Sequence, residues 1–421
     1  MLIEFSVTNF RSFRDTQTLS MVAANFPEHE ATNTFDPGLP GFGRFLRSAA
    51  IYGPNAAGKS NLMFALQWMQ RFVLQSSSTA PGVHLYQPFK LASVTREAPS
   101  EFQVTFVQER TRYEYGFSID AERVLREWLI QYVNPRGRQI FHRNFDRKKE
   151  KYSWTFSSYF KGQRAVWSEA TRPNALFLST AVQLNSEQLL PVFTWFQKRL
   201  VVVAGETSLN PALTLKLLDQ PDGKEKLLPF LREADIHIAD VEMKREVMPA
   251  GANQIMVFGT PPILEQNPGS LTPNLVRITF THRTSEQENI GFDLMEESAG
   301  TQILFRHAGA WLNVFANGEV LLFDEIDTSL HPLLTQFLIK KFHSDNTNPH
   351  NAQLIFISHN TSLLSQDLFR RDQIWFFEKN QDGASHLYPL SDFKPRNDEL
   401  LERWYMRGRY GALPILGESQ K

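Results

Sequence analysis

A glycine-rich stretch, Gly53-Pro-Asn-Ala-Ala-Gly58-Lys59-Ser60, contains the residue types that hold a triphosphate. An apolar segment precedes it and apolar residues recur at helical spacing after it, so it is predicted to join a strand to a helix. In that context the backbone N–H groups of the loop and the N-terminus of the helix face the phosphates. We expect Lys59 to reach the β- and γ-phosphates and the Ser60 hydroxyl to ligate Mg²⁺. The pattern therefore favours a phosphate-binding loop (Walker A) over a simple glycine turn.

Two carboxylates follow a second apolar segment. The run Val320–Phe323 is predicted to be a buried strand, and Asp324 and Glu325 come directly after it. Asp324 is predicted to hold Mg²⁺ directly or through water, and Glu325 to polarise the attacking water. By itself such a pair is equally well explained as surface acids at a strand end. The phosphate-binding loop in the same chain favours the catalytic interpretation.

Two further sites have both a functional and a simpler interpretation. His359 follows the apolar run Leu354–Ile357 and is predicted to sense the γ-phosphate, although a lone histidine is more often a packed or surface residue. Ser298-Ala-Gly-Thr301 is a small polar turn that opens a helix, which is an anion site by geometry. An ordinary helix N-cap formed by Ser298 explains the same turn.

The elements that position these residues are predicted from two patterns. Short apolar runs separated by helical segments indicate a parallel sheet whose carboxyl ends carry the chemistry, with Ile374–Phe377 as another strand. Between Glu101 and Phe156 aromatic residues stand two apart, which indicates an antiparallel meander. Residues 2–10 are predicted to form a strand, with residues 19–22 as its partner.

Composition limits the classes of protein. The chain has 421 residues with Lys+Arg 44 against Asp+Glu 45, a net charge of -1, so any nucleic-acid surface must be local. The absence of cysteine excludes disulfides and thiolate metal sites. No apolar run has membrane-spanning length and the start lacks the features of a signal peptide, so we expect a soluble, cytoplasmic protein without a membrane partner.

A basic stretch between Arg136 and Lys151 has interleaved aromatic residues. Contact with DNA explains it. A solvated hairpin edge that is kept positive against aggregation explains it as well.

We predict three regions from the order of these patterns. Residues 1–175 form the first half of a nucleotide-binding head, residues 176–275 a mainly helical insertion, and residues 276–421 the second half. The Pro-, Gly- and Asn-rich residues 249–273 are predicted to form a long loop.

The order of the motifs resembles that of the SMC/RecF/ABC-type ATPases. The strings that carry the resemblance are NFRSF from Asn9, GPNAAGKS from Gly53, ESAGTQ from Glu297, LLFDEIDTSLHP from Leu321 and FISHN from Phe356. More narrowly the chain is similar to stand-alone RecF-like AAA family ATPases, many of which lie in bacterial anti-phage loci. The resemblance implies an α/β ATPase head with a mixed sheet, an antiparallel meander and a parallel core, and it leaves the insertion uncovered.

The resemblance also implies roles for particular residues. In such ATPases two heads sandwich two nucleotides, and Ser298 and Gly300 match the signature that contacts the partner's γ-phosphate. Asp327 matches the loop at that interface, and His359 matches the switch histidine. Gln87 matches a glutamine that senses Mg²⁺ and water, although it also suits the first residue of a turn before Pro88. The expected nucleotide-binding set is Arg11, Asn55, Gly58, Lys59, Ser60, Asn61, Ser298, Gly300 and Asp327, and the expected Mg²⁺ set is Ser60, Asp324 and Gln87.

Two departures from the family pattern matter. Ala56 replaces the usual inner glycine of the loop, which is tolerable if its φ is negative. Ala299 and Thr301 stand where transporters carry Gly and Gln, which argues against a transporter motor.

The resulting expectation is an Mg²⁺-dependent ATP hydrolase that works with a second copy of itself. The resemblance suggests the sensor or scaffold of an anti-phage system, such as the PARIS type, acting with a separate effector protein such as a nuclease. The alternative is a RecF-like DNA-repair clamp that binds DNA through residues 136–151.

Overall fold

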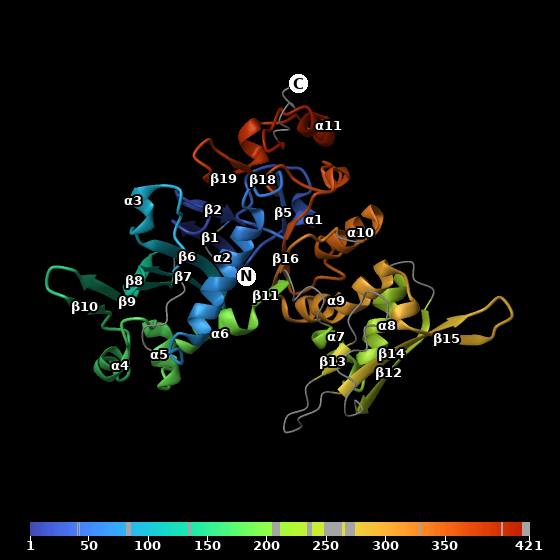
Figure 1. Ribbon diagram of the computed structural model, residues 1–421, viewed down its shortest axis with the longest axis horizontal. Helices are drawn as coiled ribbons and strands as arrows, with labels where there is room; N and C mark the ends of the chain where they lie inside the picture. The colour runs from blue at the N-terminus through green and yellow to red at the C-terminus, as the bar shows by residue number, and fades with distance from the viewer. Residues whose placement is uncertain are drawn as a thin grey trace. The chain divides into compact units, whose positions relative to one another are not determined.

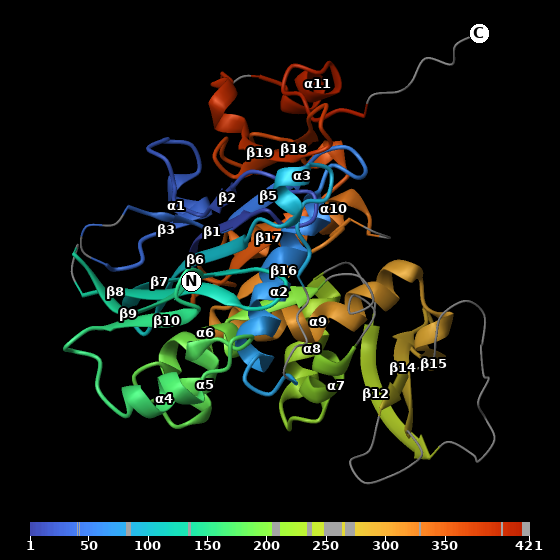
Figure 2. The same cartoon turned by 60° about the vertical axis from the view of Figure 1, so that its left-hand side comes forward.

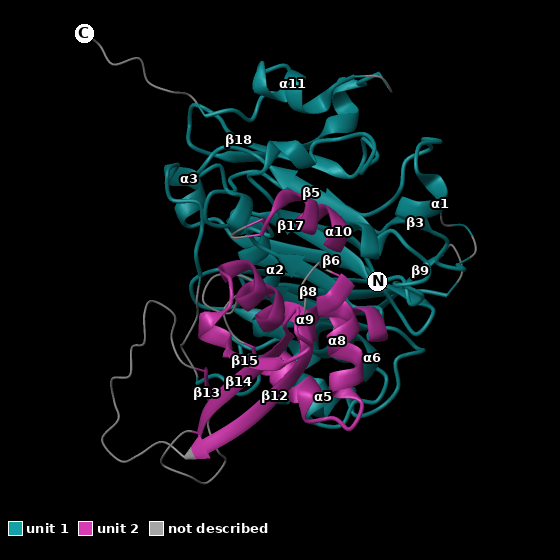
Figure 3. Cartoon of the chain, turned by 90° about the vertical axis from the view of Figure 1, so that its right-hand side faces the viewer, with its two compact units in different colours: residues 1–202, 317–326, 339–421 teal, residues 203–316, 327–338 magenta. Residues whose placement is uncertain are grey.

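The computed structural model describes residues 1–39, 41, 43–80, 86–133, 136–203, 211–233, 238–247, 263–265, 274–327, 330–396 and 399–414. They form two compact units, coloured separately in Figure 3. Unit 1 comprises residues 1–202, 317–326 and 339–421, and unit 2 comprises residues 203–316 and 327–338. No helix in these described ranges combines the length and the apolar character needed to span a bilayer.

The first sheet of unit 1 is a seven-stranded antiparallel sheet with the order β10-β9-β8-β7-β6-β1-β2 (Figure 1). Its strands are β1 (Leu2–Thr8), β2 (Gln17–Ser20), β6 (Ser100–Gln108), β7 (Thr111–Ile119), β8 (Val124–Tyr132), β9 (Gly137–Asp146) and β10 (Lys151–Phe156). The predicted meander is confirmed, as is the pairing of the first two strands. Strand β9 lies within the basic stretch and was not predicted, because its charged residues hide the alternation that marks a strand.

The second sheet of unit 1 is a six-stranded sheet with the order β11-β16-β17-β5-β18-β19. Its strands are β5 (Ser48–Tyr52), β11 (Leu200–Val203), β16 (Val320–Phe323), β17 (Gln353–Ile357), β18 (Ile374–Lys379) and β19 (Ser385–Pro389). The pairs β16–β17, β17–β5 and β5–β18 are parallel, which confirms the parallel core. Strand β19 pairs antiparallel with β18 and closes one edge.

Helix α2 (Lys59–Gln75) belongs to the apolar core that the two sheets of unit 1 share. Its predicted apolar face is confirmed, because Leu62, Leu66, Met69 and Val73 are all buried. Helix α2 also packs against α5 (Phe177–Gln183) and α6 (Leu190–Lys198), which belong to the same core (Figure 2). The shorter elements of unit 1 are α1 (Glu30–Asn33), β3 (Thr34–Phe35), β4 (Phe45–Leu46), α3 (Ser93–Arg96), α4 (Arg164–Ala170), η3 (Thr361–Leu363), η4 (Leu390–Phe393) and α11 (Leu401–Met406).

A buried ion pair fastens α5 to the antiparallel sheet. Glu127 of β8 and Arg143 of β9 are both fully buried, 3.8 Å apart. The carboxylate accepts hydrogen bonds from the backbone N–H groups of Phe177 (2.6 Å) and Leu178 (2.9 Å) at the start of α5. Arg143 donates to the carbonyl oxygen of Ala175 at 2.7 Å. These bonds satisfy the free N–H groups at the helix start, which would otherwise be buried without partners.

Unit 2 combines helices with a small antiparallel sheet of order β12-β14-β13, with β15 also paired to β14. Its elements are α7 (Ala212–Leu218), α8 (Gly223–Glu233), β12 (Ile238–Val247), β13 (Ile263–Glu265), β14 (Asn274–Arg283), β15 (Asn289–Asp293), η2 (Leu294–Glu296) and α9 (Ala299–Asn317). Helix α10 (Pro332–Phe342) begins in unit 2 and ends in unit 1. A Cβ on Gly309 of α9 would overlap the backbone at Leu213, so only glycine permits this contact with α7. Thr214 fills the junction, since its hydroxyl donates to Phe305 O and accepts from Gly309 N, both at 2.9 Å.

The predicted regions and the compact units divide the chain at different residues. Residues 176–202, which we assigned to the insertion, lie in unit 1 as α5, α6 and β11. The insertion contains strands as well as the expected helices. Most of the predicted loop 249–273 lies outside the described residues, and the part that is described is β13.

Candidate nucleotide-binding site

The glycine loop joins β5 to α2, as predicted, and two of its glycines are required by close neighbours. Gly53 has a φ of 150° and Gly58 a φ of 107°, both unfavourable for residues with a Cβ. A Cβ on Gly53 would overlap the carbonyl oxygen of Phe377, and one on Gly58 would overlap the hydroxyl of Ser385. Strands β18 and β19 thus hold the loop tightly from one side.

Ala56 departs from the expected backbone conformation. Its φ is 62°, in the left-handed region. We expected alanine to be tolerated at this position if φ were negative, and that condition is not met. The residue is exposed, and its methyl group therefore meets no steric barrier beyond its own backbone. The cost of this conformation for a residue with a Cβ is about 1 kcal/mol.

Lys59 begins α2 and lies folded over the loop. Its ammonium group donates to the carbonyl oxygens of Gly53 at 2.8 Å and of Pro54 at 2.9 Å. Burial lowers the pKa of this amine, while the charges of Asp324 and Glu325 oppose the shift. The amine is therefore in electrostatic reach of both carboxylates, and phosphate oxygens are acceptors that can replace the two carbonyls.

Asp324 is the residue whose surroundings best match a metal ligand. Burial raises its pKa, and a hydrogen bond with Ser60 and the charges of Lys59 and His359 oppose the shift. Its Oδ1 atom is buried and has no hydrogen-bond partner among the described residues. A buried carboxylate oxygen without a partner is costly unless a cation or a donor meets it. With the Ser60 hydroxyl beside it, the donor set is all oxygen, as Mg²⁺ prefers, so these residues fit the ion.

Glu325 and His359 lie at the same edge of the sheet. Strands β16, β17 and β5 are parallel neighbours, so the residues after them meet at one edge. Glu325 and His359 are exposed, and both act electrostatically on Asp324. Glu325 has a φ of 56°, so its backbone directly after β16 is in the left-handed region.

Arg11, Asn61 and Gln87 form one hydrogen-bonded cluster beside the start of α2. Arg11 Nε donates to Gln87 Oε1 at 2.7 Å, and another of its guanidinium N–H groups donates to Asn61 Oδ1 at 3.3 Å. The guanidinium also lies 3.3 Å from the centre of the Phe64 ring. The three predicted residues line a cavity of about 430 Å³. The structure gives Gln87 this arginine as its partner, and its predicted contact with Mg²⁺ stays a prediction.

A smaller cavity of about 270 Å³ brings Asn55 and His359 together with residues that we did not predict. Tyr405 and Met406 of α11 line it, so the C-terminal segment packs against the head. Ser12 is another missed residue, and its hydroxyl accepts from Asn61 Nδ2 at 2.8 Å. The NFRSF string contained Ser12, whereas no local pattern pointed to Tyr405.

Ser298, Gly300 and Asp327 belong to unit 2. The Ser298 hydroxyl accepts from the backbone N–H of Thr301 at 3.1 Å, so it caps α9 as the simpler interpretation held. Ser298 is exposed, and its hydroxyl also shares a hydrogen bond with the Thr301 hydroxyl at 2.9 Å. The contacts of these three residues with a nucleotide stay predictions.

Comparisons with known proteins give one strong match. Residues 48–365, more than half of the chain, match the model of the family described as "AAA domain, putative AbiEii toxin, Type IV TA system". No curated protein matches the chain. The SMC head domain from Thermotoga maritima is similar with a TM-score of 0.40 at 12% identity, over 92% of this chain and 98% of that chain. An SMC head bound to the C-terminal winged-helix domain of ScpA has a TM-score of 0.39 at 12% identity, over 92% and 97%.

Proposed function

The chain belongs to the AAA domain family described as putative AbiEii toxin of a Type IV TA system, and we propose that it hydrolyses ATP with Mg²⁺. The observation that carries the proposal is the buried Oδ1 of Asp324, which has no hydrogen-bond partner among the described residues; the carboxyl group interacts with the Ser60 hydroxyl and lies within electrostatic reach of Lys59. An oxygen donor set at the carboxyl edge of a parallel sheet, next to a glycine loop, suits a metal-bound triphosphate.

Each residue of the site has one task in this proposal. The loop N–H groups and Lys59 hold the β- and γ-phosphates, and Ser60 and Asp324 hold the ion. When bound, Mg²⁺ neutralises charge on the phosphate oxygens. Glu325 orients the attacking water and accepts its proton, and His359 donates a hydrogen bond to the γ-phosphate. Arg11 and Asn61 form the wall beside the helix start.

We further propose that two copies of the chain share the nucleotide. Ser298 and Gly300 of one copy would contact the γ-phosphate on the other, and Asp327 would lie at the interface. ATP then favours the closed pair and hydrolysis favours opening, because only the triphosphate bridges both copies. This switch would control a partner protein, as the sensor or scaffold of an anti-phage system with a separate effector such as a nuclease.

The RecF-like DNA clamp is the alternative, and the basic stretch gives it little support. Arg143 is buried against Glu127, and Arg147 pairs with Asp120 at 3.2 Å. Lys149 pairs with Asp146 at 3.8 Å. Strand β10 is the edge strand of its sheet, so the remaining positive charges suit a protected hairpin edge.

Phosphate release from ATP tests the enzymatic part. We expect Mg²⁺-dependent turnover in the native chain and loss of nucleotide binding in Lys59→Ala. Lys148→Ala, which changes an exposed lysine in the hairpin, is the matched control and should behave as the native chain. Unchanged ATP affinity of Lys59→Ala by calorimetry would contradict the assignment of the loop.

The partner is tested by purifying the protein with the products of its neighbouring genes. A co-purifying protein whose stoichiometry changes with ATP supports the scaffold role. Salt-dependent DNA binding that ATP strengthens, without any protein partner, would favour the clamp.

A further inference from the structure

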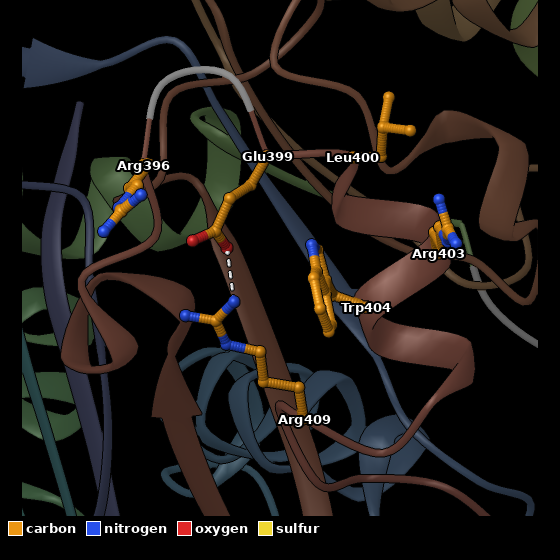
Figure 4. A pocket seen from close by; sticks show the side chains of 6 residues that line it. All are labelled: Arg396, Glu399, Leu400, Arg403, Trp404 and Arg409. Atoms are coloured by element: carbon orange, nitrogen blue, oxygen red, sulfur yellow. Dashed lines mark ion pairs between the residues drawn. The ribbon is translucent and has the colours of Figure 1, made fainter.

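The cavity on the C-terminal segment of unit 1 does not present a single ligand site. It has a volume of about 440 Å³ and is lined by Arg396, Glu399, Leu400, Arg403, Trp404 and Arg409 (Figure 4). Arg396 and Arg403 lie on opposite sides of it, so one phosphate group cannot engage both. The Glu399–Arg409 ion pair, at 3.1 Å, and the Trp404 ring lie between them. A contact that bears on the proposed function lies instead in unit 2.

Strand β14 packs one of its faces against α9, and His282 is a polar residue on that face. Side chains two apart along a strand share a face. Ile278 and Phe280 on this face are buried, and the Phe280 ring meets the Phe305 ring of α9 edge-on at 5.3 Å. The His282 ring comes next, and it meets the Phe292 ring of β15 at 5.2 Å. His282 thus continues a face whose preceding residues are apolar.

His282 is bonded to the residue that comes directly before Ser298. Its Nε2 atom lies 2.6 Å from the carboxylate of Glu297. An ionised carboxylate only accepts hydrogen bonds, so the ring donates this one. The Glu297 side chain is only 10% exposed, and a buried carboxylate without a donor is costly. The ring therefore supplies a bond that Glu297 needs in order to keep its present position.

Local bonds shape the signature turn (residues 297–301) itself. The Ser298 hydroxyl accepts from the N–H group of Thr301 at 3.1 Å, and Gln302 Nε2 donates to the carbonyl oxygen of Glu297 at 2.9 Å. These bonds set the conformation of the turn but do not fix its place on the sheet. The bond from His282 does so, because it comes from a strand that pairs with both β12 and β15.

We propose that His282 is a positioning residue for the signature turn, which it holds in place through Glu297 so that the turn can meet the γ-phosphate bound to a second copy. Without the ring, the largely buried carboxylate would turn toward water in search of a donor. The backbone of Glu297 continues directly into Ser298, so this movement would displace the turn. The inference rests on the proposed sharing of the nucleotide between two copies.

Four variants of the full chain test this role. His282→Phe removes the donor and keeps a ring in the strand, whereas His282→Gln keeps an N–H donor. Arg283→Gln is the matched control, because it changes the next residue of β14, which is exposed and points to the other face. Ser298→Arg places a bulky side chain in the turn itself and reports whether the turn takes part in pairing.

Light scattering at increasing ATP concentration measures pairing. Calorimetry with ADP measures the nucleotide loop of one copy alone, because ADP lacks the γ-phosphate that the turn would contact. We expect His282→Phe to require about tenfold more ATP for pairing, or more, and to bind ADP like the native chain. His282→Gln and Arg283→Gln should pair like the native chain. A purely structural role of His282 would lower the urea midpoint of His282→Phe and leave its ATP requirement unchanged, which would overturn the proposal.

Glu297→Ala tests the same bond from the side of the turn should His282→Phe fail to fold. It should weaken pairing to a similar degree, and the double variant should pair no worse than either single variant, because the two residues act as a unit. Independent, additive effects would overturn the proposal. So would native-like pairing of His282→Phe when Ser298→Arg fails to pair, a result that leaves the proposed function intact. Native-like pairing of Ser298→Arg would instead contradict the sharing of the nucleotide, and this inference with it.

Discussion

At the scale of single residues, the two neighbouring acids Asp324 and Glu325 differ in burial, and the proposal gives them different roles: Asp324 binds Mg²⁺ and Glu325 accepts a proton from water. Asp324 is partly buried, and burial raises its pKa, whereas Glu325 is exposed in a left-handed backbone conformation. A metal ligand benefits from a fixed, desolvated position, and a general base must reach water. The two neighbouring acids thus have environments that suit different roles.

Glu325→Gln should abolish turnover and keep ATP bound. The amide matches the shape of the carboxylate but accepts no proton, so phosphate release should fall by about 10²- to 10⁴-fold. We expect ATP to hold this variant in the closed pair, which light scattering with and without ATP measures. Exposed Glu97→Gln serves as the control. Full activity of Glu325→Gln would remove Glu325 from its role.

Ala56→Gly should stabilise the protein. Glycine adopts a φ of 62° without the steric cost that alanine bears, and part of that gain offsets the greater freedom of glycine in the unfolded chain. We expect a gain of roughly 0.5–1 kcal/mol in the free energy of unfolding, measured with urea. The neighbouring Ala57 is buried with no positive φ, so Ala57→Gly should bring no gain. Equal effects of both substitutions would contradict this explanation.

At the scale of elements, the buried Glu127–Arg143 pair determines where α5 begins. The same carboxylate that faces Arg143 also meets the first N–H groups of the helix and the Tyr115 hydroxyl at 3.0 Å. One side chain on β8 therefore joins two strands and a helix that are distant in the sequence. This arrangement explains how β9 carries an arginine into the core.

Glu127→Gln should destabilise the fold strongly. It leaves the Arg143 charge buried without a counter-ion, at an expected cost of about 3–5 kcal/mol in urea unfolding. Glu114 of β7 is half-buried and accepts from the Tyr132 hydroxyl at 3.1 Å, so Glu114→Gln should cost less than about 1 kcal/mol. The double substitution Glu127→Gln/Arg143→Met should recover most of the loss, because no buried charge remains and the amide oxygen still accepts from the N–H groups of Phe177 and Leu178. A double variant as unstable as Glu127→Gln would show that shape, and not charge, decides the effect.

At the scale of the whole molecule, each compact unit buries a histidine that the fold keeps neutral. His343 in unit 1 has Nε2 at 2.8 Å from the Ser48 hydroxyl, and burial lowers its pKa to about 3. His307 in unit 2 has its pKa lowered to about 4, again mainly by burial. Both folded-state pKa values lie below the unfolded value of about 6.5.

Acid should therefore weaken both units. Below a pH of about 6.5 both histidines bind protons in the unfolded chain but stay neutral in the folded chain. The free energy of unfolding therefore falls as the pH falls toward the two folded-state pKa values. Each histidine contributes a loss of about 1.4 kcal/mol per pH unit in that window. Urea unfolding at pH 7.5 and 5.5 measures the loss, and His343→Gln should reduce the difference between the two pH values. A difference of the same size in that variant would exclude His343 as a source.

Several features of this protein followed from the sequence by itself. The glycine loop, the acids after an apolar run and the aromatic alternation are local patterns, because phosphate binding and strand pairing use residues at short, regular spacing. Those patterns predicted the parallel core, the meander, and the neighbourhood of Lys59, Ser60, Asp324 and His359. Arg11, Asn61 and Gln87 came from the resemblance, and the structure joins them in one cluster.

Only the tertiary structure decided the rest. Strand β9 pairs with β8 and β10, and Glu127 of β8 compensates the charge of its buried Arg143. Strands β18 and β19 approach Gly53 and Gly58 of the loop so closely that a Cβ would not fit. The limits of the two units likewise depend on contacts between distant residues. The local spacing of residues carries no information on which distant side chain will meet a buried charge. For this physical reason the contacts between distant residues could not be predicted from the sequence.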